Sequence, residues 1–260
     1  MPAEHHSKNP SSQIKAAFDK HGYVILREFL PPDEVAQVRN ELNRYIQDVI
    51  PNIPPDHAFY EEKNDLSTLK QLPHMQDNDA YFKDLIFGNN AYRRLAELLL
   101  EGGVVGRNLQ LLRKPPAIGQ PTPPHQDGYY FMIEPCEGIT MWLALDEANE
   151  ENGCLRYVRG SHKKGLRPHS RTQTLGFSQG ITNYGTDYDQ KNEIAHTAQP
   201  GDLLVHHALT VHRADGNNSA THPRTALGFV YLSERAKEQT EHLAEYRKKL
   251  AEDLAEQGKI

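Results

Sequence analysis

The spacing of apolar residues changes near residue 102 and divides the chain into a helical part and a strand-rich part. In the first part, one run predicts an amphipathic helix whose apolar stripe packs in the core: Val35, Val38, Leu42, Tyr45 and Val49. Proline and acidic residues at 31–34 favour the start of this helix. The same reasoning predicts further helices over 11–20, 79–87 and 91–100, a strand over 23–26 and an irregular segment over 64–79.

From Gly102 onward, short apolar runs alternate with turn signals, which favours a barrel or a sandwich. The predicted strands cover 104–112, 125–133, 139–145, 155–158, 194–198, 202–207 and 225–232. Asn152-Gly153 is predicted to form a turn in which glycine takes a positive φ. The polar stretch 165–192 is predicted to be a long loop over the mouth of a site, and 233–257 a charged helix.

Composition narrows the class of protein. The chain has 260 residues, 37% hydrophobic and 25% charged, which suits one globular domain over 1–260, with a helical part over 11–100 and a barrel over 102–232. A net charge of −6 gives no basic surface, so we expect no nucleic-acid partner. Neither a signal peptide nor a membrane span is predicted. The two cysteines, Cys136 and Cys154, form no disulfide framework, which favours the cytoplasm.

The candidate chemistry lies at His125-Gln126-Asp127. On one strand, residues two apart share a face, so His125 and Asp127 would point the same way. His212, from a separate strand, would complete a set of two histidines and one carboxylate, which is typical of non-heme Fe(II) oxygenases. Arg224 would hold the far carboxylate of a keto-acid cosubstrate. The chain has 14 histidines, so chance occurrence of a His-x-Asp is the competing explanation.

An ordered series of motifs resembles the phytanoyl-CoA dioxygenase family of Fe(II)- and 2-oxoglutarate-dependent oxygenases. The series is Pro-His-Gln-Asp (124–127), Met-Trp-Leu-Ala-Leu-Asp (141–146), Glu-Asn-Gly-Cys-Leu (151–155), Gly-Ser-His-Lys (160–163), Pro-Gly-Asp (200–202), His212, Asn-Ser (218–219) and Arg224. The resemblance spans about residues 20–232. It implies a mainly β fold, a double-stranded β-helix (jelly-roll, cupin-like) barrel with flanking helices.

The resemblance also implies roles for single residues. His125, Asp127 and His212 match the iron ligands, and Arg224 matches the residue that pairs with 2-oxoglutarate. Trp142 and Gln110 match positions that line the cosubstrate pocket. Many relatives have serine two residues after the second histidine, whereas this chain has Ala214, so Ser219 or Lys114 is expected to supply the missing contact.

Other histidines and cysteines have structural interpretations. His162 is expected to be hydrogen-bonded within the fold, and Cys154 to be a small core residue. His206 and His207 alternate across a strand, so only one of them can face the barrel interior.

The resemblance implies an iron dioxygenase that uses 2-oxoglutarate and O2, hydroxylates an unactivated C–H bond of a small polar or anionic molecule, and releases succinate and CO2. An aspartate at position 127 favours hydroxylation over halogenation. The alternatives are a zinc hydrolase with the same ligands and a non-catalytic barrel that binds a small molecule. The candidate substrate contacts are Tyr129, Tyr130, Arg156, Arg213 and the 165–192 loop. The substrate's identity and the oligomeric state are not indicated by the sequence.

Overall fold

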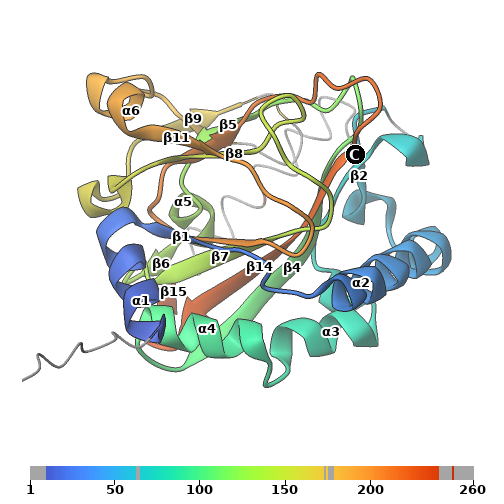
Figure 1. Cartoon of the computed structure of the whole chain (residues 1–260), viewed down its shortest axis with the longest axis horizontal. Coiled ribbons are helices and arrows are strands. Elements are labelled where there is room, and N and C mark those ends of the chain that lie inside the picture. The colour runs from blue at the N-terminus through green and yellow to red at the C-terminus, as the bar shows by residue number, and fades with distance from the viewer. Residues whose placement is uncertain (1–9, 63–64, 173, 175–178, 240–247, 249–260) are drawn as a thin grey trace, which may run out of the picture.

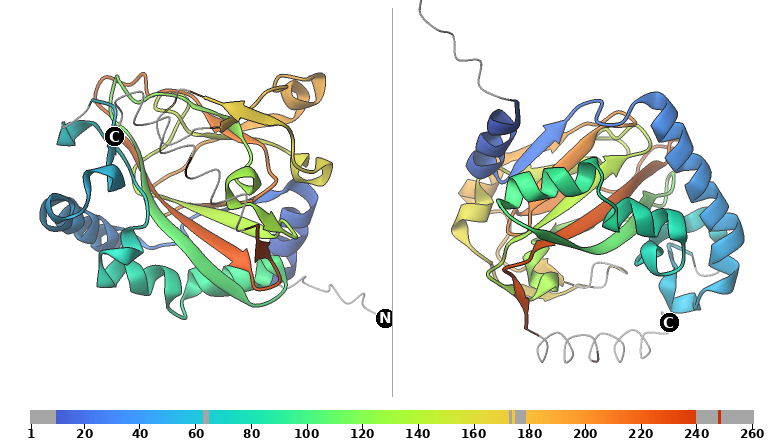
Figure 2. Two further views of the ribbon diagram at one scale, coloured as in Figure 1. Left: turned by 180° about the vertical axis from the view of Figure 1, so that it is seen from behind. Right: turned by 90° about the horizontal axis from the view of Figure 1, so that it is seen from below.

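The computed structural model describes residues 10–62, 65–172, 174, 179–239 and 248. Two antiparallel sheets face each other, with helices packed on the outside of the larger one (Figures 1 and 2). The larger sheet has the order β1 (Tyr23–Leu26), β12 (Leu203–His207), β7 (Gly138–Ala144), β14 (Arg224–Ser233), β4 (Val104–Lys114), β3 (Leu69–Leu72) and β2 (Phe59–Tyr60). The smaller sheet has the order β11 (Glu193–His196), β8 (Leu155–Val158), β13 (His212–Ala214) and β5 (Thr122–His125).

Two short ribbons complete the β structure: β9 (His169–Arg171) with β10 (Gln179–Ile181), and β6 (Ile133–Glu134) with β15 (Lys237–Glu238). The helices are α1 (Pro10–His21), α2 (Pro32–Arg44), α3 (Ala80–Phe87), α4 (Ala91–Leu100), α5 (Gly128–Phe131) and α6 (Asp187–Asn192). A π turn over Tyr45–Val49 extends α2, and 3-10 turns cover Ile50–Asn52, Pro55–His57, Leu66–Thr68, Met75–Asp77 and Ser161–Lys164.

Local sequence explains where the N-terminal helices begin. The side chains of Asp79 and Asn90 accept hydrogen bonds from the first backbone N–H groups of α3 and α4, which have no partner within the helix. Proline at the start of α2 has the φ value that a helix requires. The predicted helices and the strand over 23–26 are therefore confirmed, with bounds that differ by a few residues at most.

Both faces of β14 are buried, and they have different neighbours. Phe229 stacks on Tyr92 of α4 with ring centroids 4.4 Å apart, and the Tyr231 hydroxyl donates to the Ile86 carbonyl at 2.9 Å. The alternate residues Arg224, Val230 and Leu232 line an internal cavity. The large sheet therefore separates a hydrophobic core under the helices from a cavity between the sheets.

Four predictions need correction. The segment 64–79, predicted to be irregular, contains β3 and two 3-10 turns. The segment 125–133 is not one strand: β5 ends at His125, Asp127 has helical backbone angles (φ −59°, ψ −31°), and α5 follows. The Phe131 N–H donates to the Asp127 carbonyl at 3.0 Å, so local hydrogen bonding overrides the strand preference of the aromatic run.

The predicted loop over 165–192 contains β9, β10 and α6, although residues 173 and 175–178 lie outside the described residues. In the predicted helix over 233–257, Ser233 ends β14, and Lys237–Glu238 form β15 beside β6. Most of the remainder, 240–247 and 249–257, lies outside the described residues. The turn at Asn152-Gly153 is confirmed, because Gly153 has a φ of +87°.

Candidate metal centre and cosubstrate pocket

The smaller sheet brings the two candidate histidines together. β5 and β13 are neighbours, and His125 pairs directly with His212 across them, with ring centroids 4.1 Å apart. Asp127 lies two residues beyond the end of β5, where the chain turns into α5. One ligand atom from each of the three side chains lies within 4.8 Å of the other two, close enough for one metal ion. The expected convergence is present, but a turn rather than a shared strand face produces it.

The hydrogen bonds of the two imidazoles orient them for a metal. Nδ1 of His125 lies 2.8 Å from the Pro123 carbonyl, and Nδ1 of His212 lies 3.0 Å from the Thr210 carbonyl. A carbonyl only accepts, so each Nδ1 carries a proton, and in the neutral imidazole Nε2 then carries the lone pair that a metal would use. These Nε2 atoms lie 3.5 and 3.7 Å from Oδ1 of Asp127. Burial, followed by His125 and His206, lowers the pKa of His212 well below its ordinary value, which favours the neutral ligand form.

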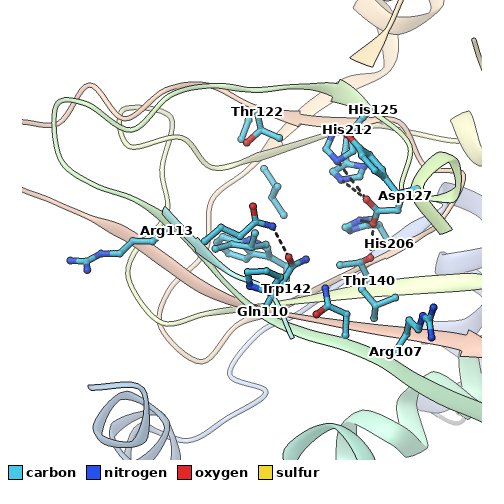
Figure 3. Close-up of a pocket in the computed structure, with 18 of the residues that line it drawn as sticks. Arg107, Gln110, Arg113, Thr122, His125, Asp127, Thr140, Trp142, His206 and His212 are labelled. Carbon is cyan, nitrogen blue, oxygen red and sulfur yellow. Dashed lines mark hydrogen bonds and ion pairs between the residues drawn. The ribbon is translucent and has the colours of Figure 1, made fainter. Parts of the chain in front are cut away.

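The second oxygen of Asp127 faces away from the histidine pair. Its Oδ2 accepts a hydrogen bond from Thr140 Oγ1 at 2.5 Å and lies 3.0 Å from Nε2 of His206 (Figure 3). His206 faces the cavity, whereas His207 packs beside Phe18 and His162 on the other side of the sheet. The expected alternation is confirmed. The contact of His206 with Asp127 was not predicted, because no local motif links positions 127 and 206.

The cavity between the sheets has a volume of about 310 Å³. His125, Asp127 and His212, called the triad below, lie on its wall. Its lining also includes the four residues expected near a cosubstrate: Gln110, Lys114, Trp142 and Arg224. The guanidinium carbon of Arg224 lies 5.4 Å from the centre of the Trp142 ring. Oε1 of Gln110 accepts a hydrogen bond from Gln71 at 2.8 Å.

Two buried cations mark one part of this cavity. Arg224 is 4% exposed and Lys114 is 3% exposed. Burial lowers the pKa of Arg224 to about 10. Burial, followed by the charge of Arg224, lowers the pKa of Lys114 well below its ordinary value. Among the described residues, Nε of Arg224 has no hydrogen-bond partner. A buried cation with an unsatisfied donor favours an anionic ligand, because desolvation is otherwise uncompensated.

The two suggested replacements for the family serine are placed differently. Ala214 and Lys114 both line the cavity. Nζ of Lys114 donates to the Gln120 carbonyl and lies 3.3 Å from Thr122 Oγ1. The hydroxyl of Ser219 lies 3.2 Å from Nδ1 of His222, and Ser219 is not among the described lining residues. The geometry therefore favours Lys114 over Ser219.

The candidate substrate contacts are also separated. Tyr130 lines the cavity, whereas Tyr129 stacks on His169 with centroids 4.4 Å apart. Arg156 and Arg213 form ion pairs with Glu150, Glu193 and Asp215, and neither is among the described lining residues. Arg107, not singled out from the sequence, lines the cavity and pairs with Glu238 at 2.7 Å.

Comparison with known proteins decides the family. The family model for phytanoyl-CoA dioxygenase (PhyH) matches residues 18–226. The chain belongs to the phytanoyl-CoA dioxygenase family. Phytanoyl-CoA dioxygenase 1 of Oryza sativa subsp. japonica is 28% identical over 235 residues, which cover 78% of this chain and 82% of the rice protein. The peroxisomal phytanoyl-CoA dioxygenase of Bos taurus is 23% identical, with 80% of this chain and 65% of the bovine protein covered. A probable alpha-ketoglutarate-dependent hypophosphite dioxygenase of Stutzerimonas stutzeri is 26% identical, with 84% and 77% covered.

Solved structures support the barrel fold of this family member. EctD from S. alaskensis with bound Fe superposes with a TM-score of 0.71 at 20% identity, covering 89% of this chain and 79% of EctD. The alpha ketoglutarate dependent carbocyclase SnoK gives a TM-score of 0.70 at 22% identity, with 91% of both chains covered. The expected double-stranded β-helix is confirmed.

Family membership and the donor set together identify the chemistry. This member of the phytanoyl-CoA dioxygenase family is a non-heme iron dioxygenase that uses 2-oxoglutarate and O2. Two imidazoles, one carboxylate oxygen and a buried guanidinium group whose Nε has no hydrogen-bond partner among the described residues fit Fe(II) and a dicarboxylate cosubstrate. None of the helices in the described ranges has the length and apolar character needed to cross a membrane.

Proposed function

We propose that this dioxygenase hydroxylates an unactivated C–H bond of a small polar or anionic molecule. Nε2 of His125, Oδ1 of Asp127 and Nε2 of His212 would hold Fe(II) on one face and leave its other positions open. When bound, the iron with 2-oxoglutarate and O2 supplies the oxidising chemistry. The observation that carries the proposal is that one cavity is lined by the triad and by the buried Arg224, whose Nε has no hydrogen-bond partner among the described residues.

The cosubstrate would lie between the triad and Arg224. Thr140 contacts Asp127, and Trp142 is the next residue of β7 on the same face. Thr140 thus contacts the triad at Asp127, and Trp142 contacts the Arg224 guanidinium, whose carbon lies 5.4 Å from the ring centre. Trp142 therefore lies between the triad and the cation along this strand. Arg224 would bind the distal carboxylate of 2-oxoglutarate, with Lys114 as a second cation and Gln110 on the wall.

The substrate would occupy the part of the cavity near the other end of β14. That region is lined by apolar side chains, Phe131, Val230 and Leu232, and by the polar side chains of Asn108 and Arg107. In Figure 3, Arg107 lies on the same side of the cavity as Asp127, whereas Arg113 points away from it. An amphipathic molecule fits this lining, with the apolar walls excluding water. An anionic group near Arg107 would displace or share its ion pair with Glu238.

Release of succinate separates this function from the two alternatives. Anaerobically purified protein would be loaded with Fe(II), given 2-oxoglutarate and O2, and tested with a panel of small polar and anionic compounds. We expect succinate, with formation accelerated by a substrate and abolished when Zn(II) replaces Fe(II). Hydrolysis supported by Zn(II) without succinate would indicate the zinc hydrolase. Metal binding without turnover of 2-oxoglutarate would indicate the binding protein.

We also propose that the chain is one dioxygenase domain and that it acts in the cytoplasm. The helices on the outer face of the large sheet share one hydrophobic core with the strands, which supports a single domain. Cys136 and Cys154 are free thiols, which suits a reducing compartment. Fractionation of cells that express a tagged chain would test the compartment, since several relatives are named as peroxisomal.

A further inference from the structure

We infer that His206 and Tyr157 are positioning residues that hold the Asp127 carboxylate so that only Oδ1 faces the metal. This inference rests on the proposed iron site and goes beyond it. Oδ2 accepts a hydrogen bond from Thr140 Oγ1 at 2.5 Å and lies 3.0 Å from His206 Nε2. Two donors occupy the two lone pairs of one carboxylate oxygen. The other oxygen is directed toward the Nε2 atoms of His125 and His212.

The register of the large sheet places the two donors side by side. Thr140 on β7 and His206 on β12 are direct cross-strand partners, and both are buried. The side chains of such a pair lie on the same face, so both reach one carboxylate oxygen. The pair therefore forms a rigid clamp on a residue that itself lies in a short turn.

Tyr157 fixes the orientation and tautomer of His206. Its hydroxyl lies 3.0 Å from Nδ1 of His206. In a neutral imidazole, donation from Nε2 to the carboxylate leaves Nδ1 as the acceptor, so the tyrosine hydroxyl donates. Tyr157 is fully buried, and its ring stacks on Tyr23 with centroids 4.7 Å apart, which holds the hydroxyl in place. The order of donation is therefore Tyr157 to His206 to Asp127.

This clamp has a consequence for the open side of the metal. A carboxylate that is free to rotate can bind a metal through both oxygens and occupy one more coordination position. Holding Oδ2 on Thr140 and His206 would leave only Oδ1 of Asp127 for a bound metal, so that positions would remain for 2-oxoglutarate and O2. The clamp therefore acts on the geometry of the site as well as on metal affinity.

The test is an anaerobic titration of the full chain with Co(II) and with Fe(II), followed by absorption spectra with and without 2-oxoglutarate. His206→Met removes the donor, and we expect metal affinity to fall roughly 10- to 100-fold, as is usual for the loss of a partner of a metal ligand. The Co(II) spectrum and the visible charge-transfer band of the Fe(II)–2-oxoglutarate complex should also shift. His206→Gln keeps an N–H donor and should restore much of the affinity. His207→Met, on the other face of β12, is the matched control and should leave the spectra unchanged.

A double-mutant comparison separates positioning from packing. Tyr157→Phe keeps the ring and should weaken metal binding less than His206→Met does, with a shift of the same spectral features. Added to His206→Met, it should have no further effect on metal affinity, because the hydroxyl acts through the imidazole. Additive effects would overturn the role of Tyr157. If His206→Met does not fold, Tyr157→Phe decides, and wild-type spectra would overturn the inference.

Failure of the inference and failure of the proposed iron site give different results. Wild-type affinity and spectra in His206→Met, together with loss of metal in His125→Ala, would overturn the clamp alone. Retention of metal by His125→Ala would overturn the proposed iron site as well.

Discussion

The guanidinium group of Arg224 lies over the ring of Trp142, with its carbon 5.4 Å from the ring centre, inside a cavity that the metal triad also lines. Arg224 is the first residue of β14, whereas Trp142 pairs with Gly228, four residues further along that strand. The two side chains therefore meet on the cavity wall although their backbone positions lie four residues apart in register. This placement brings a residue at a strand end into the lining of the cavity.

Arg224→Lys should bind 2-oxoglutarate poorly, because an ammonium group cannot make the two parallel hydrogen bonds that a guanidinium group makes to a carboxylate. We expect a loss of about 2–4 kcal/mol, or roughly 30- to 1,000-fold in affinity, since the pair is desolvated. Calorimetric titration with 2-oxoglutarate measures this loss. Metal affinity should be unchanged, and unchanged 2-oxoglutarate affinity would remove Arg224 from the cosubstrate site.

Lys114→Met tests the second cation. Burial and the charge of Arg224 hold the pKa of Lys114 well below its ordinary value in the free protein. An arriving carboxylate favours the charged form and raises that pKa, so 2-oxoglutarate affinity should fall as the pH rises through the free-state value. We expect Lys114→Met to bind 2-oxoglutarate roughly 10- to 100-fold more weakly than the wild type. The affinity of the variant should no longer fall as the pH rises.

The measurement for Lys114 is titration at several pH values in buffers of different ionisation enthalpy, which reports the protons taken up on binding. Lys83→Met, on the exposed side of α3, is the control. Equal affinities for Lys114→Met and Lys83→Met would show that Lys114 does not contact the cosubstrate.

Much of the fold follows from local sequence signals, but the clamp on Asp127 does not. Caps such as Asn90 and a regular apolar stripe predict α4 to the residue, because these signals act within a few positions. Asp127 is different: its neighbours Tyr129 and Tyr130 favour a strand, yet the chain turns into a helix after His125. The contact of His206 with Asp127 joins residues 79 positions apart and depends on how the two sheets pack against each other, which no local pattern specifies.

Replacement of His125, Asp127 or His212 with alanine should abolish stable Fe(II) binding and turnover of 2-oxoglutarate while the fold is retained. Each residue supplies one of three ligand atoms that lie within 4.8 Å of one another, so the remaining two cannot hold the ion well. Anaerobic metal titration and the yield of succinate measure the effect, with circular dichroism to check folding. Near-wild-type turnover in any one variant would show that its residue is not a ligand.

The metal-free protein should lose stability as the pH falls from about 6.5 to about 4. Burial lowers the pKa of His196 and of His207 to about 4, whereas the ordinary value is 6.5. Between these values the unfolded chain binds protons that the folded chain does not, so protonation favours unfolding. His196→Phe keeps a ring against Tyr23 and should make the thermal midpoint less sensitive to pH in this window. If the thermal midpoints of the variant and the wild type changed equally with pH, His196 would not contribute to the loss of stability.

Gln126→Leu should destabilise the segment 125–127, because the Gln126 side chain hydrogen-bonds this segment to two other parts of the chain. Gln126 is fully buried between His125 and Asp127. Its Nε2 donates to the carbonyls of Gly165 at 2.9 Å and Leu209 at 2.7 Å, and its Oε1 accepts from the Arg167 N–H at 2.8 Å. Leucine would leave these buried backbone groups without partners, which should cost roughly 2–4 kcal/mol in the free energy of unfolding.

In Gln126→Leu, metal affinity should fall together with the free energy of unfolding, since the hydrogen bonds of Gln126 position the neighbouring His125 and Asp127. Gln190→Leu is the matched control, because Gln190 is exposed on α6 and its Nε2 donates to the Gly185 carbonyl within the same segment. Denaturant unfolding and anaerobic metal titration of both variants measure the two effects. If Gln126→Leu unfolded and bound metal like Gln190→Leu, the segment 165–192 would not support the metal centre. The expected difference would instead show that the residue between the two candidate ligands holds them in place through its hydrogen bonds to Gly165, Arg167 and Leu209.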